Sequence, residues 1–235
     1  MSFNTDKCKV LHVGRSNSQG VYTMNGTPLA VTEKERDIGV IISHTLKPSS
    51  QCSEAARRAS AVLTQISKAF LYRDRKVFLQ LYKSFVRCHL EFAVTSWAPW
   101  SNGDIDILER IQRRAVNLVT GLRGRTYEEK LSELGLKSLR ERRIQYDLVQ
   151  TFKILRGIDR VDKAIWFNEI GQIEHIPTRN TTYAGNLVQA RSRTDVRKYF
   201  YSNRVVPIWN ALPTEVKDAR TVNIFKSRLE EIKLT

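Results

Sequence analysis

Residues 104–118 read Asp-Ile-Asp-Ile-Leu-Glu-Arg-Ile-Gln-Arg-Arg-Ala-Val-Asn-Leu, and they carry the clearest helical period in the chain. Apolar residues recur at intervals of three and four, which places their side chains on one face of an α-helix. This stripe consists of Ile105, Leu108, Ile111, Ala115, Leu118 and Leu122. The opposite face carries Arg110, Arg113, Arg114 and Asn117. We therefore expect a helix that begins at Ser101 or Asp104, ends before Gly121 and Gly124, and has one basic face.

The same period recurs on both sides of this stretch. One helix is predicted over residues 49–72, with Ser49 or Ser50 as its cap, and another follows from Asp74 towards Pro99. Two capping boxes, Thr126-x-x-Glu129 and Ser138-x-x-Glu141, open helices that stop at Gly135 and Gly157. Residues 221–234 form a last amphipathic helix, whereas residues 158–190 lack a clear period and are predicted to be irregular.

The first 48 residues have a different character, because short β-branched runs alternate with turn signals. Runs at residues 9–13, 21–24, 27–31 and 39–42 are strand-sized, and Asn25-Gly26 between the second and third is a two-residue hairpin signal. The fold class predicted for the chain is therefore α+β and mostly helical, with a short N-terminal β meander.

The charge balance indicates the class of partner. The chain has 235 residues with 39 Lys+Arg against 24 Asp+Glu, a formal net charge of +15 and a pI near 10.0. Such an excess favours a polyanion, and nucleic acid before an anionic membrane. No apolar run reaches the length of about 18 residues that spans a bilayer, so no membrane partner is expected.

The cysteines and the N-terminus favour a location inside the cell, in the nucleus or the cytoplasm. Cys8, Cys52 and Cys88 are odd in number and far apart, which suits free thiols in a reducing compartment. The N-terminus has neither the basic lead nor the apolar stretch of a secretory signal. Cys8-x-x-x-His12 and Cys88-His89 lack the four ligands at finger-like spacing that a zinc site needs, so no bound metal is expected.

Several separated motifs, in order, resemble the C-terminal part of the reverse transcriptase of LINE-type (non-LTR) retrotransposons of the jockey-like kind. The motifs are Phe3-Asn4-x-x-Lys7-Cys8, Asp37-Ile38-Gly39-Val40, the segment 82–92 (Tyr-Lys-Ser-Phe-Val-Arg-Cys-His-Leu-Glu-Phe), the segment 109–115 (Glu-Arg-Ile-Gln-Arg-Arg-Ala), Leu139-Arg140-Glu141-Arg142-Arg143 and Trp209-Asn210-Ala211-Leu212-Pro213. The resemblance departs from the family pattern at Ile38, Cys88 and Phe92, where the family has Leu, Pro and Tyr. It implies a palm remnant with a primer-grip-like hairpin over residues 1–48, a thumb-like helical bundle over 49–125 and a helical C-terminal extension over 126–235.

The resemblance also defines what this chain is expected to lack. In the family, one Asp and the Asp-Asp of a Tyr-x-Asp-Asp motif, all upstream of the palm-closing segment, hold two metal ions for nucleotidyl transfer. This chain begins at that segment and contains no Asp-Asp pair; Asp104-x-Asp106 lies at a predicted helix start, where carboxylates favour the helix dipole. We expect no catalysis and no cofactor in this chain alone, with Mg²⁺ needed only in the intact parent. Lys7 matches a palm lysine that can protonate pyrophosphate, and without those aspartates it is expected to be an exposed lysine.

Arginines on or beside the predicted helices are the candidate contacts to nucleic acid. They are Arg57, Arg58, Arg110, Arg113, Arg114, Arg123, Arg125, Arg142 and Arg143. Arginine suits bidentate phosphate contacts, and about six such contacts predict a log–log salt slope of roughly −4 to −5. The alternative is a solvated face paired with Glu54, Glu109 and Glu141. Tyr199, Phe200, Tyr201 and Trp209 can stack on unpaired bases or pack a small core, and the core is favoured.

The sequence therefore predicts a fragment of an RNA-directed DNA polymerase that binds RNA or an RNA–DNA duplex through its phosphate backbone. An upstream polymerase palm is the expected protein partner. Two alternatives stay open: a helical protein-interaction module, and a relic of a transposable element without a selected function.

Overall fold

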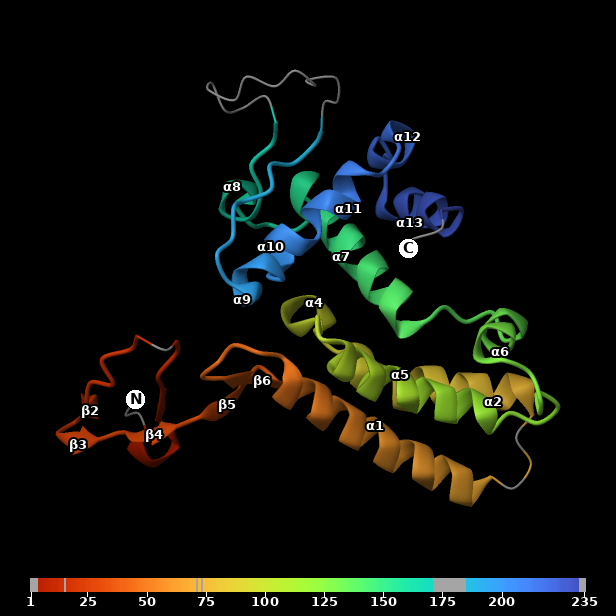
Figure 1. The fold of residues 1–235 in the computed structure, drawn as a ribbon, viewed down its shortest axis with the longest axis horizontal. Helices are drawn as coiled ribbons and strands as arrows, with labels where there is room; N and C mark the ends of the chain where they lie inside the picture. The colour runs from red at the N-terminus through yellow and green to blue at the C-terminus, as the bar shows by residue number, and fades with distance from the viewer. Residues whose placement is uncertain (1–3, 15, 71, 73, 171–184, 233–235) are drawn as a thin grey trace. The chain divides into compact units, whose positions relative to one another are not determined.

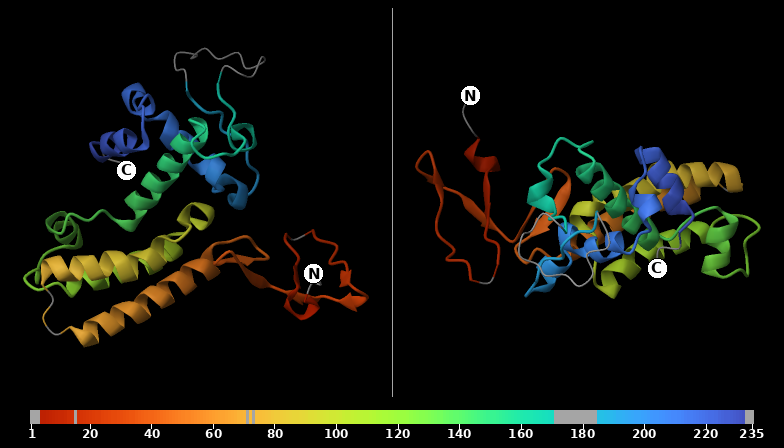
Figure 2. Two further views of the ribbon diagram at one scale, coloured as in Figure 1. Left: turned by 180° about the vertical axis from the view of Figure 1, so that it is seen from behind. Right: turned by 90° about the horizontal axis from the view of Figure 1, so that it is seen from above.

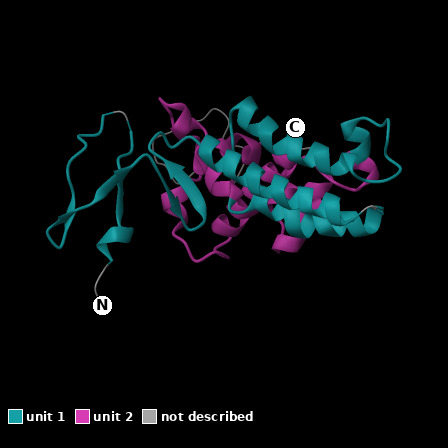
Figure 3. Cartoon of the chain, turned by 90° about the horizontal axis from the view of Figure 1, so that it is seen from below, with its two compact units in different colours: residues 1–93, 99–130 teal, residues 94–98, 131–235 magenta. Residues whose placement is uncertain are grey.

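The computed structural model describes residues 4–14, 16–70, 72, 74–170 and 185–232, and helices dominate it (Figure 1). This confirms the α+β, mostly helical class. The chain forms two compact units, which Figure 3 distinguishes by colour. Unit 1 comprises residues 1–93 and 99–130, and unit 2 comprises residues 94–98 and 131–235. The predicted β segment thus shares a unit with the helical bundle that follows it. Phe3 of the first motif lies outside the described residues.

The β part of unit 1 consists of three two-stranded ladders rather than one meander. A 3-10 turn, η1 (Thr5–Lys7), precedes β1 (Lys9–Leu11), which pairs in parallel with β4 (Ala30–Thr32). β2 (Thr23–Met24) and β3 (Thr27–Pro28) form the hairpin predicted at Asn25-Gly26, whose residues both have positive φ. β5 (Lys34–Asp37) pairs antiparallel with β6 (Val40–Ser43).

The β5–β6 hairpin has an unusual turn. Ile38 (φ 43°) and Gly39 (φ 85°) both adopt the left-handed region, as a type I′ turn requires. A β-branched residue is strained there, and Ile38 is 87% exposed, so packing does not offset the strain. A Cβ on Gly39 would lie 2.9 Å from Cε1 of Phe92. Two motifs that are distant in sequence, one ending at Val40 and one at Phe92, therefore meet in space.

The helical part of unit 1 is a bundle around α1 (Ser49–Ala69). A second rod continues through α2 (Arg75–Leu81), the π-helical turn η2 (Tyr82–Val86) and α3 (Arg87–Glu91). The third member is α5 (Asn102–Asn117), which packs beside α1 (Figure 1 and Figure 2). α6 (Tyr127–Glu133) begins with the predicted capping box, in which Thr126 and Glu129 exchange backbone-to-side-chain hydrogen bonds of 2.7 and 3.2 Å.

The predicted helix starts hold with one exception. Asp74 caps α2, and Ser101 rather than Asp104 caps α5. The prediction that Ser49 or Ser50 caps α1 is wrong, because the N-cap residue is Pro48 and no side chain caps that end. The Ser49 hydroxyl instead donates to the Asp104 carboxylate at 2.8 Å. Asp104 also accepts from Ser101 at 2.7 Å, so its role is structural.

Unit 2 is built on α7 (Leu139–Leu155), which begins with the predicted Ser138–Glu141 capping box and ends before Gly157. The other helices are α4 (Val94–Trp97), α8 (Lys163–Trp166), α9 (Asp195–Lys198), α10 (Tyr201–Arg204), α11 (Val206–Asn210), α12 (Thr214–Lys217) and α13 (Val222–Glu230). Phe152 of α7 stacks on Phe225 of α13 at 4.4 Å, and Trp209 packs beside them. Burial of Tyr201 and Trp209 in this core confirms the packing interpretation for both rings, whereas for Phe200, which is 43% exposed, that interpretation is wrong.

Candidate nucleic-acid interface

The exposed face of α5 holds three of the candidate arginines together. At about 100° per residue, Arg110, Arg113 and Arg114 fall within an arc of about 100°. All three are exposed, whereas Leu108, Ile111, Ala115 and their neighbours on the opposite face are buried. Burial of one stripe against the bundle thus fixes the direction in which the arginines point. The structure therefore confirms the predicted placement of these arginines opposite the buried apolar stripe.

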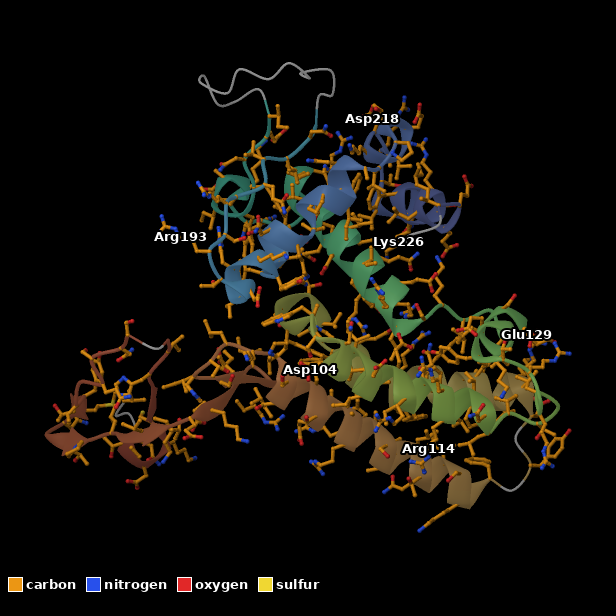
Figure 4. All side chains as sticks on the ribbon, in the orientation of Figure 1. Asp104, Arg114, Glu129, Arg193, Asp218 and Lys226 are labelled. Carbon is orange, nitrogen blue, oxygen red and sulfur yellow. The ribbon has the colours of Figure 1, made fainter. Side chains whose placement is uncertain are left out.

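Arg114 connects α5 to α1. Its two terminal nitrogens donate to the hydroxyls of Ser60 and Thr64 at 3.0 Å each. Figure 4 labels the Arg114 side chain. Because Ser49 contacts Asp104 and Ser60 contacts Arg114, α1 and α5 run in the same direction. Both hydroxyls are neutral acceptors, so they orient the guanidinium without neutralising its charge. The sequence alone did not single out Ser60 and Thr64; their spacing of four residues on the polar side of α1 is the available signal.

Arg113 is positioned by an aromatic ring. Its guanidinium carbon lies 5.1 Å from the centroid of Tyr127, which is a cation–π contact. The Tyr127 hydroxyl donates to Glu109 Oε2 at 2.8 Å and accepts from Gln112 Nε2 at 2.9 Å. Burial, followed by the nearby Glu109 carboxylate, raises the pKa of Tyr127, so the phenol stays protonated and continues to donate.

The hydrogen-bond chain continues into the bundle. Gln112 is fully buried, and its Oε1 accepts from the Tyr82 hydroxyl at 2.5 Å. Tyr82 belongs to η2, Gln112 to α5 and Tyr127 to α6, so one polar chain fixes three elements against each other. Such satisfied buried networks rigidify the helices that they join. We infer that this hydrogen-bond network fixes the orientation of the face of α5 that carries the arginines. The sequence alone did not predict that Tyr82, Gln112 and Tyr127 would be hydrogen-bond partners.

Arg57 and Arg58 differ from the α5 arginines because they share one carboxylate. Glu54 accepts from Arg57 and Arg58 at 2.8 Å, and from Arg36 of β5 at 3.2 Å. The guanidiniums of Arg57 and Arg58, more than that of Arg36, lower the pKa of Glu54 to about 2. The carboxylate therefore stays ionised and offsets one of three positive charges. The anticipated alternative, a face paired with Glu54, thus applies to these two arginines.

Arg123 and Arg125 follow α5 in the connection to α6, and both are exposed. Gly121 and Gly124 beside them have positive φ, which explains why the helix does not continue. Within residues 4–14, 16–70, 72, 74–170 and 185–232, no ion pair involves Arg110, Arg113, Arg114 or Arg123. These four arginines keep their full charge on the surface of unit 1.

Arg142 and Arg143 lie in unit 2. Arg142 contacts Tyr146, with its Nη2 donating to the Tyr146 hydroxyl at 2.8 Å. Arg143 is only 5% exposed, which corrects its assignment to a solvent-facing surface. The physical reason is a second buried stripe on α7, this one polar, that consists of Arg143, Asp147 and Thr151. Arg143 interacts electrostatically with Asp147, so its charge is directed at a buried carboxylate of unit 2.

Arg204 of α10 completes that interior. It donates to both carboxylate oxygens of Asp147 at 2.8 and 2.9 Å, and to the carbonyl oxygen of Thr95 at 2.7 Å. Thr151 and Tyr201 share a further hydrogen bond of 2.9 Å. These bonds join α4, α7 and α10, so the segment 94–98 belongs to unit 2 although its sequence neighbours belong to unit 1.

The remaining candidates are Lys7 and the potential metal ligands. Lys7 ends the η1 turn and is exposed, as expected. Among the residues that the structure describes, no group of three or more His, Cys, Asp and Glu is placed to hold a metal ion. In the same residues, no helix is both long and apolar enough to cross a membrane.

Comparison with known proteins returned no relative. No protein-family model, no curated protein and no solved structure matches this chain.

Proposed function

We propose that unit 1 binds the phosphate backbone of an RNA-containing duplex, as the thumb of an RNA-directed DNA polymerase of a retrotransposon does. The observation that carries this proposal is the face of α5, on which Arg110, Arg113 and Arg114 keep their charge and project together. The ordered sequence motifs support the same assignment, and the net charge of +15 favours a polyanionic partner.

The way the arginines are held favours phosphates over bases. Arg114 is tied to two hydroxyls of α1, and Arg113 lies over the ring of Tyr127. Side chains fixed near a helix surface in this way present a charged, planar fork but cannot reach far into a groove. A fork of this kind matches the two oxygens of a phosphate and carries no sequence information. Binding to the duplex is therefore independent of base sequence.

Nucleotidyl transfer by this chain alone is not part of the proposal. The reaction uses two metal ions held between carboxylates. Asp104, the carboxylate in the Asp104-x-Asp106 pair, is instead engaged by two serine hydroxyls. The role proposed here is to hold the duplex while an aspartate-bearing palm performs the chemistry.

The test is a comparison of duplexes. Three RNA–DNA hybrids of equal length and unrelated sequence are titrated with the protein at low salt and followed by fluorescence anisotropy. The proposal predicts dissociation constants that agree within about threefold, since phosphate contacts do not discriminate between bases. A preference of a hundredfold or more for one sequence would contradict backbone recognition. An affinity that ignores ionic strength would instead favour the protein-interaction module.

A further inference from the structure

Unit 2 contains a groove of about 370 Å³ between α7 and α13, with Thr95 of α4 at its edge. Val149 of α7 and Leu229 of α13 provide an apolar floor. This floor is continuous with the core of unit 2, where Phe152 stacks on Phe225. The two helices are therefore held against each other by their buried faces, and the groove is a built feature of unit 2.

The walls of this groove, which we call the α7–α13 groove, are predominantly cationic. Arg142, Lys153 and Lys226 line it, against the single carboxylate of Glu230; Lys226 on α13 is labelled in Figure 4. In the described parts of the chain, no ion pair or side-chain hydrogen bond engages the ammonium groups of Lys153 and Lys226. Charge complementarity therefore selects an anionic occupant.

An aromatic ring and two amides accompany the cations. Tyr146 is 38% exposed, and the guanidinium carbon of Arg142 lies 5.4 Å from its ring centroid. Gln145 and Gln150 also line the groove, and the amide nitrogen of Gln150 is fixed by Asp159 at 2.7 Å. Ring faces stack on bases, amides bond to base edges and cations contact phosphates. An acidic peptide would use the cations but would leave the ring and the amides without a matching partner.

We propose that the α7–α13 groove binds an unpaired stretch of RNA or DNA. Tyr146 stacks on a base, while Lys153, Lys226 and Arg142 contact the adjoining phosphates. The volume lies at the lower end of the range of ligand sites, about 300–1,000 Å³, which suits one or two nucleotides and excludes a duplex. Paired bases hide their faces from a side chain, so stacking on Tyr146 requires a single strand. This site is separate from the duplex interface of unit 1 and does not depend on it.

The test uses a fluorescent single-stranded 12-mer of uridylate and the full chain. The variant Lys153→Gln/Lys226→Gln is compared with Arg160→Gln/Arg220→Gln, which removes two exposed positive charges elsewhere in unit 2. We expect the groove variant to weaken binding about 25-fold at 0.1 M salt and to lower the log–log slope by about 1.4, from about 0.7 per lost phosphate contact. The control variant is expected to change affinity by less than about threefold.

Two variants of Tyr146 separate stacking from charge. Tyr146→Leu should weaken binding at least about fivefold, whereas Tyr146→Phe, which keeps the ring, should bind like the wild type. Binding to a blunt RNA–DNA hybrid should be unchanged in all of these variants, so loss of the duplex interface in unit 1 would be recognised separately. Equal losses in the groove and control variants, wild-type affinity of Tyr146→Leu, or no binding of the 12-mer at all would overturn the proposal. Displacement of the 12-mer by an equal concentration of a polyglutamate peptide would also overturn it, by assigning the groove to an acidic protein segment.

Discussion

Replacing two arginines on α5 gives a quantitative test of the duplex interface. Arg113→Gln/Arg114→Gln removes two charges that no carboxylate offsets in the described residues, while Tyr127, Ser60 and Thr64 remain. Each lost phosphate contact lowers the log–log salt slope by about 0.9, so the slope should become shallower by about 1.8. If those contacts contribute little at 1 M salt, the affinity should fall about 60-fold at 0.1 M salt and about 18-fold at 0.2 M.

The assay is an anisotropy titration of a labelled RNA–DNA hybrid at five salt concentrations. The matched control is Lys76→Gln/Lys83→Gln, which removes the same charge from exposed positions on α2 and η2. The control should keep the wild-type slope within about 0.5, and thermal melting should confirm that both variants fold. The reasoning is refuted if the α5 variant keeps the wild-type slope, or if the control loses as much affinity as the α5 variant.

Three further substitutions test charge and packing within the two units. Glu54→Gln should tighten hybrid binding and steepen the slope by about 1, because three guanidiniums lose their shared carboxylate. The folded state lowers the pKa of Glu54 to about 2, from an unfolded value near 4.5. The stability that Glu54 contributes is therefore fully present above pH 4.5 and is lost as the pH falls towards 2. Urea unfolding should show this loss for the wild type but not for the Gln variant. Gly39→Ala should destabilise the protein by about 2–4 kcal/mol, because backbone strain adds to a clash of the new Cβ with Phe92 at 2.9 Å. Gly26→Ala should cost only about 1–2 kcal/mol, because its added Cβ meets open space. Equal effects of the two variants on the urea midpoint would contradict this. Arg204→Met should cost about 3–5 kcal/mol, because the buried Asp147 carboxylate loses its bidentate partner; a loss below about 1 kcal/mol in the same unfolding assay would contradict this.

Local signals predicted the longer helices because those signals act over short distances. The short helices α8 to α12 were not predicted, and α8 lies in the segment 158–190 that was expected to be irregular. The capping boxes at Thr126 and Ser138 begin α6 and α7 as expected, and the Asn25-Gly26 turn forms its hairpin. The second hairpin was missed because Ile38 is a residue that hardly ever adopts a left-handed turn conformation. In the structure Phe92 lies against Gly39, and this contact explains the glycine of the turn but not its isoleucine.

The candidate site was predictable to the extent that burial follows helical period. The period of α5 places Arg110, Arg113 and Arg114 outward, as the structure has them. The same reasoning misplaced Arg143, because a second stripe of α7 is buried against α10 and is polar. A single-helix period cannot distinguish a buried polar stripe from a solvated one, since the difference is supplied by Arg204, about sixty residues away in the chain.

The central claim, that the arginine face of α5 contacts a nucleic-acid backbone, is tested most directly by arginine footprinting. The protein is treated with phenylglyoxal with and without an RNA–DNA hybrid, and modified residues are quantified by mass spectrometry. The account predicts that the hybrid protects Arg110, Arg113 and Arg114 while Arg160 and Arg220 of unit 2 react equally in both samples. Protection that is absent from α5, or that falls only on unit 2, would contradict it.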